Sequence, residues 1–371
     1  MKGQWIGRYV GTNSGLAILD LDEEDTHYRG HVFAFDDREG LPTVVAEVVT
    51  PDKGPEHTIT TTAIAAVRPG TTLLISREQL AQDYPDIAFP SQFTFTLLET
   101  ENGLSANWTS DLGTSGTASL ASSDCDKGSE LTPLPEVTGW TSFKDYVLSL
   151  PHRKYIFRGQ DVCKRLRTSF HRTRRKDLVR YLFTDVQEAH RALTARTRHV
   201  FDLGRSEQNA AFLNLLQHHG FPTPLLDWTH SPFVAAFFAY RHRRERPLDD
   251  DKVRIFIFNR ELWMSRWSQV QSITFARPHF SILEALSIEN QRAIPQQALL
   301  SATNVDDIES YVRSKEAEAG QTYLQAVDLP ISERRRVMEE LSGMGITAGS
   351  LLPGLDGACE ELRGRFFYPL V

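Results

Sequence analysis

Arg158 is the residue whose type and position are best suited to chemistry. It follows the short apolar stretch 155–157 and precedes Gly159. An arginine that closes a strand beside a glycine suits the close approach of a ligand, because glycine carries no side chain that would occupy the space. A structural salt bridge to Asp227 would also explain this arginine. The sequence therefore predicts either a ligand contact or an ion pair at Arg158.

A block of basic residues surrounds this position. Residues 153–247 carry 19 Lys and Arg against 8 Asp and Glu, which is +11, so the remainder must carry −18 for the chain total of −7. Such a block favours anionic partners, either nucleotide phosphates or a nucleic-acid backbone. A solvated helical face that the acidic flanks neutralise is the alternative. The candidate nucleic-acid contacts are Arg165, Arg167, Arg172, Arg174, Arg175 and Lys176.

Three histidines and a carboxylate follow as His218, His219, Asp227 and His230. Such side chains bind zinc or manganese, but their spacing matches no established ligand motif, and we predict no metal site. His218 could act as a base or ligand contact, or bond the last carbonyls of a helix. Trp228 could stack on a base, although a tryptophan in an apolar strand is more often part of the core.

These residues lie in a region of mixed α/β pattern that begins near residue 138. Apolar alternation indicates strands, and a period of 3.6 residues indicates helices. Ser231 followed by Pro232 is typical of a helix start. The expected strands are 155–157, 224–228, 252–258 and 298–300, and the expected helices are 177–198, 207–218 and one from 232.

Residues 1–122 instead read as all-β, with short strands separated by Gly-, Asp- and Asn-rich turns. This pattern predicts an antiparallel barrel or sandwich. Trp5 and Trp108 lie in strands that open and nearly close it, either around a ligand lumen or as core residues. Residues 123–137 form a linker by composition, so the second domain is expected at 138–371. The expected strands are 3–7, 17–19, 31–35, 44–49, 71–75, 93–98 and 106–109.

Composition and cysteine usage predict a soluble, cytoplasmic protein. No apolar run approaches the roughly 18 residues of a membrane span, and the N-terminus lacks signal-peptide features. The three cysteines are far apart, which gives neither a disulfide framework nor a zinc pattern.

Four stretches occur in the order expected of an FRG domain. They are Tyr155-Ile-Phe-Arg-Gly-Gln160 with Leu166–Arg172, the long motif LQHHGFPTPLLDWTHSPFVA at 216–235, RAIPQQAL at 292–299, and Gly345-Ile-Thr347 with LPGLDG at 352–357. On these motifs, the part of the chain from residue 155 to residue 367 resembles the FRG domain family. Two positions depart from the family pattern: Pro224 replaces an arginine, which removes a possible phosphate contact, and Ala298 replaces a glycine.

The order of the motifs also resembles that of Arg-Ser-Glu-type mono-ADP-ribosyltransferases. The resemblance implies an α+β fold with an ADP-ribosyltransferase-like NAD site, in which Arg158 holds the phosphates. Gln297 stands where the catalytic Glu is expected, and it lacks the charge that stabilises an oxocarbenium-like transition state. Asp227 is the candidate replacement. The catalytic set is then Arg158, Asp227 and Gln297, and the cofactor-binding set is Arg158, Gly159, Gln160, His218, Trp228, Thr229 and Ser231, with Thr229 or Ser231 on the ribose.

The resemblance thus implies an NAD-dependent ADP-ribosyltransferase or NAD glycohydrolase. A macromolecule, with nucleic acid as one candidate, would be the acceptor. Because FRG domains are associated with bacterial defence, it also implies a toxin or anti-phage effector whose β domain senses an unknown ligand or protein. Two alternatives stay open: a non-enzymatic module that binds nucleotide or RNA, and a metal-dependent nuclease that uses the His/Asp group.

Overall fold

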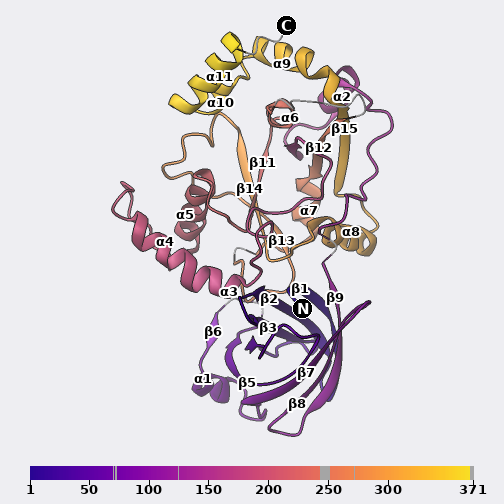
Figure 1. The fold of residues 1–371 in the computed structure, drawn as a ribbon, viewed down its shortest axis with the longest axis vertical. Coiled ribbons are helices and arrows are strands. Elements are labelled where there is room, and N and C mark those ends of the chain that lie inside the picture. The colour runs from indigo at the N-terminus through magenta and orange to yellow at the C-terminus, as the bar shows by residue number, and fades with distance from the viewer. Residues whose placement is uncertain (70, 72, 124, 243–250, 271, 368–371) are drawn as a thin grey trace.

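The N-terminal domain is a closed antiparallel β-barrel of eight strands (Figure 1). The computed structural model describes all residues except 70, 72, 124, 243–250, 271 and 368–371. Each barrel strand pairs with the next barrel strand along the chain, which gives seven pairs. The pairing of the last strand, β9, with the first, β1, closes the barrel. The elements are β1 Gly3–Gly11, β2 Gly15–Glu23, β3 Tyr28–Asp36, β4 Thr43–Val49, β5 Glu56–Val67, β6 Leu74–Ile75, which is added to β5, α1 Arg77–Asp83, β7 Gln92–Thr100, β8 Gly103–Ser110 and β9 Ser115–Ser122.

The barrel interior is packed with apolar side chains, among which the aromatic rings are the largest. Trp5 and Trp108 are both buried, and Tyr9 meets Trp108 edge-on with ring centroids 6.3 Å apart. Alternate residues of each strand point inward, which is how a small barrel fills its interior. The predicted barrel is confirmed, and its two tryptophans are core residues.

The C-terminal domain is built on a six-stranded sheet in the order β13-β14-β11-β10-β12-β15, and all neighbouring strands run antiparallel. Both faces of its central strands are covered, so these strands are apolar along most of their length. Their bounds are β10 Tyr155–Gln160, β11 Leu225–Thr229, β12 Lys252–Asn259, β13 Phe280–Leu283, β14 Ala298–Thr303 and β15 Leu324–Pro330.

Helices cover the sheet on both faces (Figure 1). The expected helix over 177–198 is instead a chain of short pieces, with a π-helical turn at Tyr181–Asp185 between α3 and α4. It ends early, where the Thr194 hydroxyl bonds back to the carbonyl of His190 at 2.7 Å. The helices are α2 Trp140–Ser149, α3 Leu178–Arg180, α4 Val186–Leu193, α5 Ser206–His218, α6 Pro232–Tyr240, α7 Arg260–Arg266, α8 Ile308–Ala319, α9 Arg334–Gly343, α10 Ala348–Leu351 and α11 Leu355–Phe367.

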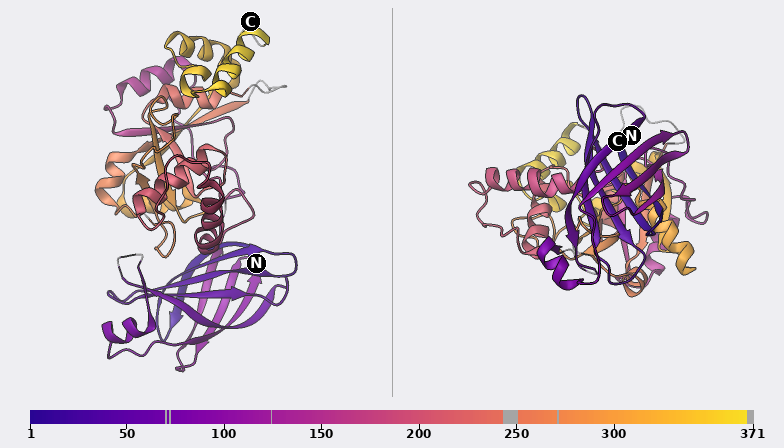
Figure 2. Two further views of the ribbon diagram at one scale, coloured as in Figure 1. Left: turned by 90° about the vertical axis from the view of Figure 1, so that its left-hand side faces the viewer. Right: turned by 90° about the horizontal axis from the view of Figure 1, so that it is seen from below.

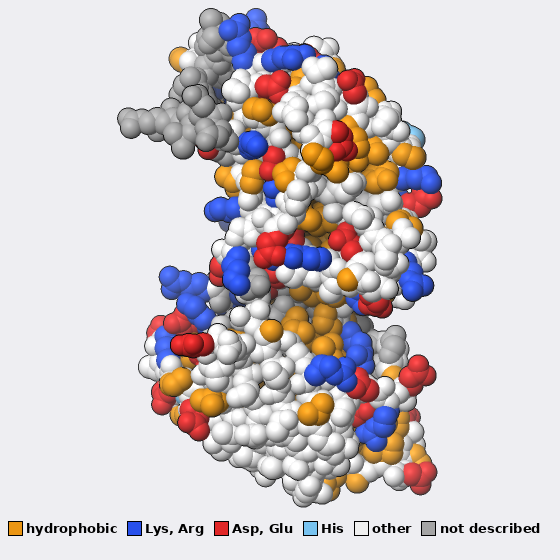
Figure 3. Space-filling model, turned by 90° about the vertical axis from the view of Figure 1, so that its right-hand side faces the viewer, with side chains coloured by type: hydrophobic (Ala, Val, Ile, Leu, Met, Phe, Trp, Pro, Cys, Tyr) orange, Lys and Arg blue, Asp and Glu red, His pale blue; other side chains and the backbone are white. Residues whose placement is uncertain are grey.

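The two domains stack end to end (Figure 2) and meet at a waist that is hollowed on the face shown in Figure 3. Apolar contact at the junction includes Phe33 of β3 and Phe275, whose ring centroids lie 6.2 Å apart. Within the expected linker 123–137, residues 125–137 run along the C-terminal domain: Leu134 N–H donates to the Ala326 carbonyl at 2.9 Å, and Gly128 bridges to Lys164. The junction is therefore a packed interface.

Candidate functional site

A cleft of about 1230 Å³ opens where the C-terminal sheet divides. β10 and β11 are paired at one position, between Phe157 and Thr229, so the two strands separate beyond it. The volume exceeds the roughly 300–1,000 Å³ of common ligand pockets. Among the described residues, nine Lys and Arg side chains line it against four Asp and Glu side chains. The cleft is therefore large and electropositive.

Arg158 lies at this division of the sheet with its side chain 16% exposed. Its Nη1 donates to the backbone carbonyl of Asp227 at 2.7 Å and lies 4.0 Å from the carboxylate of the same residue. Burial, which Asp227 opposes and Arg172 reinforces, lowers the pKa of Arg158 to about 10. Its Nε is buried with no hydrogen-bond partner among the described residues. Arg158 thus contacts Asp227 and keeps one donor without a described partner, and its contact with a ligand stays a prediction.

The Asp227 carboxylate is held by a side chain that the sequence did not identify as functional. Gln217, near the end of α5, donates from Nε2 to Asp227 Oδ1 at 2.5 Å. The hydroxyl of Thr223 donates to Gln217 Oε1, which turns the amide NH₂ toward Asp227. Asp227 itself is 64% exposed and lines the cleft. The signal was the position of Gln217 in the same motif, ten residues before Asp227.

Further polar groups in the cleft lack partners. His218 lines the cleft, and burial, with Arg292 and His219, lowers its pKa to about 4, so its imidazole is neutral at pH 7. His230 Nδ1 and Arg292 Nε are buried without a hydrogen bond to the described residues. Buried polar atoms are rarely left unpaired in native proteins, so a ligand or water that completes them is expected here.

Gly159 and Trp228 have structural roles that differ from the predicted ones. A Cβ on Gly159 would lie 1.9 Å from the Ala235 carbonyl oxygen, so this glycine admits the backbone of α6 and not a ligand. Trp228 is 2% exposed, its Nε1 donates to Ser301 Oγ at 2.9 Å, and its ring packs on Phe258. A ring enclosed in this way serves the core, although Trp228 also borders the cleft, and its stacking on a base stays a prediction.

The two candidate ribose contacts stabilise the turn into α6. Thr229 Oγ1 donates to the Gln296 carbonyl at 2.7 Å and accepts from the Ser231 N–H. Ser231 Oγ accepts from the Val234 N–H as the helix cap. Both hydroxyls thus have a structural role in this turn, and their contact with a ribose stays a prediction. Gln160 does line the cleft, and its amide donates to the Lys164 carbonyl at 3.0 Å.

Gln297 lies outside the cleft. Its backbone has a left-handed φ of 47°, its side chain is exposed, and the neighbouring Gln296 lines the cleft instead. The Gln296 amide donates to the carbonyl of Leu351 at 2.9 Å. In the turn before β14, Gln296 and not Gln297 thus lines the cleft, and the alignment of a reacting ribose by Gln297 stays a prediction.

Much of the basic block is folded into the protein. Arg165 and Lys176 are 4% and 7% exposed, and Arg165 Nη1 contacts Asp307 at 2.7 Å. Arg167 binds Asp306 through Nε at 2.6 Å and Nη2 at 3.0 Å. These side chains are therefore paired inside the protein, although Arg165 and Arg167 also border the cleft. Their contact with nucleic acid stays a prediction.

The remaining members of the block point in different directions. Arg175 pairs across the domain junction with Asp22 at 2.5 Å. Arg172 lines the cleft, and Arg174 is exposed. Of the predicted nucleic-acid contacts, Arg172 and Arg174 are the exposed ones.

The described part of the chain contains no group of three or more His, Cys, Asp or Glu placed to hold a metal ion. The His/Asp group of the sequence is therefore not assembled into a metal centre there. In the same part, no helix has the length and apolar character needed to cross a bilayer.

The features above define a mixed α+β domain whose divided sheet holds a basic cleft. Residues 153–247 of this domain match the family model described as the FRG domain, so the chain carries an FRG domain in its C-terminal part. The two motifs nearest the C-terminus, at 292–299 and 345–357, lie beyond the match, and their assignment stays a prediction. No curated protein matches the chain, and no solved structure matches it.

Proposed function

We propose that the cleft of the FRG domain binds the diphosphate of a nucleotide and that it acts on NAD, as an NAD glycohydrolase or ADP-ribosyltransferase. Arg158 is the observation that carries this proposal. It is a buried cation whose carboxylate neighbour lies at the limit of ion-pair distance and whose Nε has no described partner. Guanidinium groups bind phosphate oxygens in a bidentate manner and keep their charge when buried.

The neighbouring arginines support a phosphate site at the same place. Arg158 and Arg172 both line the cleft, and burial lowers the pKa of both. Arg292 also lines the cleft, and its Nε, like that of Arg158, is buried without a partner among the described residues. Like charges held together in a partly buried cleft are stabilised by an anion between them. The volume of about 1230 Å³ leaves room for a dinucleotide and an acceptor.

Asp227 is the carboxylate that this proposal assigns to the chemistry. In the reaction, the bond from C1′ of the ribose to the nicotinamide nitrogen breaks, and its electron pair leaves with nicotinamide. The oxygen of water or of an acceptor forms the new bond to C1′, and its proton passes to solvent. Asp227, held by Gln217 at 2.5 Å, would stabilise the positive charge that develops on the sugar.

The experiment measures release of nicotinamide from NAD by the purified full-length chain, with and without a lysate as acceptor. The variants are Arg158→Ala and Asp227→Asn, and Arg313→Ala is an arginine control that lies outside the cleft and is 49% exposed. We expect each cleft variant to lose tenfold or more of the rate, about the effect of one charge-stabilising group. The control should match wild type.

The outcomes separate binding from chemistry. Turnover that Arg158→Ala abolishes while the fold persists supports the whole proposal. ADP-ribose binding that depends on Arg158, without nicotinamide release, would leave a nucleotide-binding module and refute catalysis. Neither binding nor turnover at saturating NAD would refute the site itself.

A further inference from the structure

A buried glutamine of the barrel contacts the FRG domain on two sides of one loop. Gln4 is 2% exposed and lies in β1. Its Nε2 donates to the Asn304 carbonyl at 2.7 Å, and its Oε1 accepts from the N–H of Asp306 at 2.8 Å. Nε2 also donates to Asp20 within the barrel at 2.9 Å. The amide is thus fully hydrogen-bonded, and two of its three bonds cross the domain junction.

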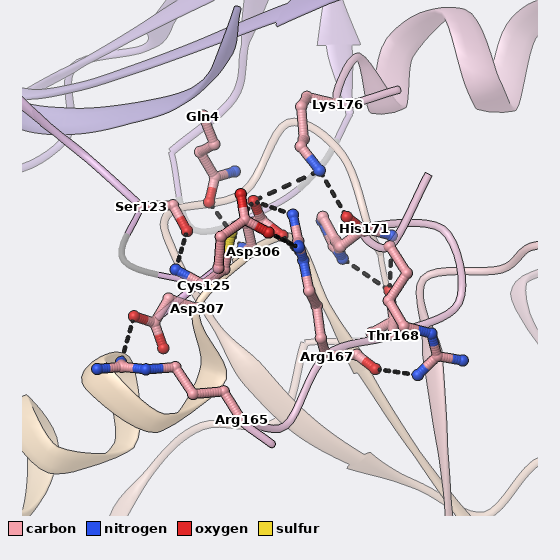
Figure 4. A network of polar contacts seen from close by, with 12 residues as sticks. Gln4, Ser123, Cys125, Arg165, Arg167, Thr168, His171, Lys176, Asp306 and Asp307 are labelled. Atoms are coloured by element: carbon pink, nitrogen blue, oxygen red, sulfur yellow. Dashed lines mark hydrogen bonds and ion pairs between the residues drawn. The ribbon is translucent and has the colours of Figure 1, made fainter. Parts of the chain in front are cut away.

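Asp306 in turn holds both ends of the loop 167–176 (Figure 4). At one end, Arg167 donates two hydrogen bonds to its carboxylate. At the other end, Lys176 Nζ lies 3.4 Å from Asp306 and donates to the carbonyl of His171 at 2.5 Å. The carboxylate is 1% exposed, so these contacts are shielded from water and from salt.

Arg172 lies between the two anchored ends and faces the cleft. Its Nη1 donates to the Arg167 carbonyl at 2.9 Å. The preceding residue, His171, is buried, and Arg172 lines the cleft. A continuous chain of contacts therefore runs from Gln4 through Asp306 and Arg167 to Arg172. The apolar part of the junction would suffice for adhesion, whereas buried hydrogen bonds fix one relative position.

We propose that Gln4, a residue of the barrel, is a positioning residue for the nucleotide cleft. It fixes Asp306, and Asp306 fixes the loop that places Arg172 in the cleft that Arg158 also lines. This inference rests on the proposed binding of a diphosphate by these two arginines. The barrel would then contribute to ligand binding in the cleft, and a substitution at the domain junction would lower the affinity without touching the ligand.

The test is a double-mutant cycle on ADP-ribose affinity, measured by calorimetry with the full-length chain. Gln4→Met keeps the length of the side chain and removes its hydrogen bonds. Hydrogen bonds to charged groups are worth about tenfold or more in affinity, so a loosened Arg172 should weaken binding about three- to tenfold. The matched control is Glu24→Gln, which removes the negative charge that Arg180 contacts across the same junction.

The cycle distinguishes positioning from general destabilisation. If Gln4 acts through Arg172, then Gln4→Met should have no further effect in an Arg172→Gln background, since coupled residues are not additive. Additive effects would overturn the proposal, and so would equal effects of Gln4→Met and Glu24→Gln. If Gln4→Met does not fold, Gln4→Asn, which keeps an amide one methylene shorter, takes its place.

Hydrogen exchange separates this proposal from the proposed function. Gln4→Met should raise amide exchange in the loop 167–176, and Glu24→Gln should not. Such a result would support positioning even if the wild-type chain bound no ADP-ribose, which would refute only the nucleotide site. Unchanged exchange in the loop would overturn the role of Gln4 whatever the affinity.

Discussion

Gly159→Ala tests whether the glycine of the Arg-Gly pair serves helix packing or ligand approach. The added methyl group would lie 1.9 Å from the Ala235 carbonyl oxygen and 2.8 Å from the Ala239 backbone nitrogen. Non-bonded carbon contacts settle near 3.5–4.0 Å, so α6 would have to move away by roughly 1.5 Å. Both neighbours are backbone atoms, and neither can turn aside.

The cost should lie at or above the upper end of ordinary overpacking, which is about 3 kcal/mol. For a domain of 150–250 residues, 1 kcal/mol shifts Tm by roughly 2–4 °C, so a loss of about 6–12 °C is expected in the transition of the C-terminal domain by calorimetry. Gly364→Ala is the matched control, because it lies in α11 with nothing within 4 Å of a new Cβ. Alanine in a helix interior should be stabilising there by roughly 0.5–1 kcal/mol.

A Gly159→Ala protein that melts with wild type would refute the packing argument. That result would favour the alternative, in which the space beside Gly159 allows the close approach of a ligand. Loss of ADP-ribose binding at unchanged Tm would point the same way.

Three further predictions concern the core, pH and the cell. Trp228→Phe should leave ADP-ribose affinity within about twofold of wild type and lower stability by roughly 1–3 kcal/mol, since it removes the bond to Ser301 and part of a core ring; calorimetry measures both. His171 and His279 are buried, and burial lowers their pKa to about 3 and about 4, so only the unfolded chain takes up their protons between pH 6.5 and 4. The contribution of these two histidines to the free energy of unfolding should therefore be fully present above pH 6.5. It should fall as the pH drops, by up to roughly 2.7 kcal/mol per pH unit for the two. Denaturant titrations at several pH values should show a smaller loss of unfolding free energy per pH unit in His279→Gln. Expression of the wild-type chain in a bacterial host should slow growth if the cleft consumes NAD, and expression of Arg158→Ala should not; equal growth at equal protein levels would contradict the proposed effector role.

Local sequence signals predicted most of the elements that position the cleft. The helix expected at 207–218 and the strand at 224–228 correspond to α5 and β11, and Ser231 caps α6 as its place before a proline indicates. β5 was missed because Thr58, Thr60 and Thr62 alternate with residues of which few are apolar. Its stability comes from pairing with β4 and β7, which no local pattern records.

The site was only partly predictable for the same reason. Arg158 and Asp227 were named from their residue types, and the structure joins them. Nothing in the sequence distinguished Gln217 and Gln296 from other Asn and Gln residues, and the tertiary structure shows that both line the cleft. Gln297 shows the converse. Its position in a motif made it a candidate site residue, but it lies in the turn before β14 and does not line the cleft. Side-chain direction at a turn is set by tertiary contacts that spacing does not carry.

The basic block shows that a count of charged residues gives the net charge of a segment but does not identify what its side chains bind. The partners of Arg167 and Arg175 are Asp306 and Asp22, each more than 130 residues away along the chain. Of the nine cations that line the cleft, Arg165, Arg167 and Arg241 are paired with carboxylates, whereas Arg158 and Arg292 each keep a buried Nε without a described partner. A polymer backbone needs a row of exposed cations, whereas one diphosphate needs two or three that converge. The arrangement of charge therefore favours a small phosphorylated ligand in the cleft over nucleic acid along the surface.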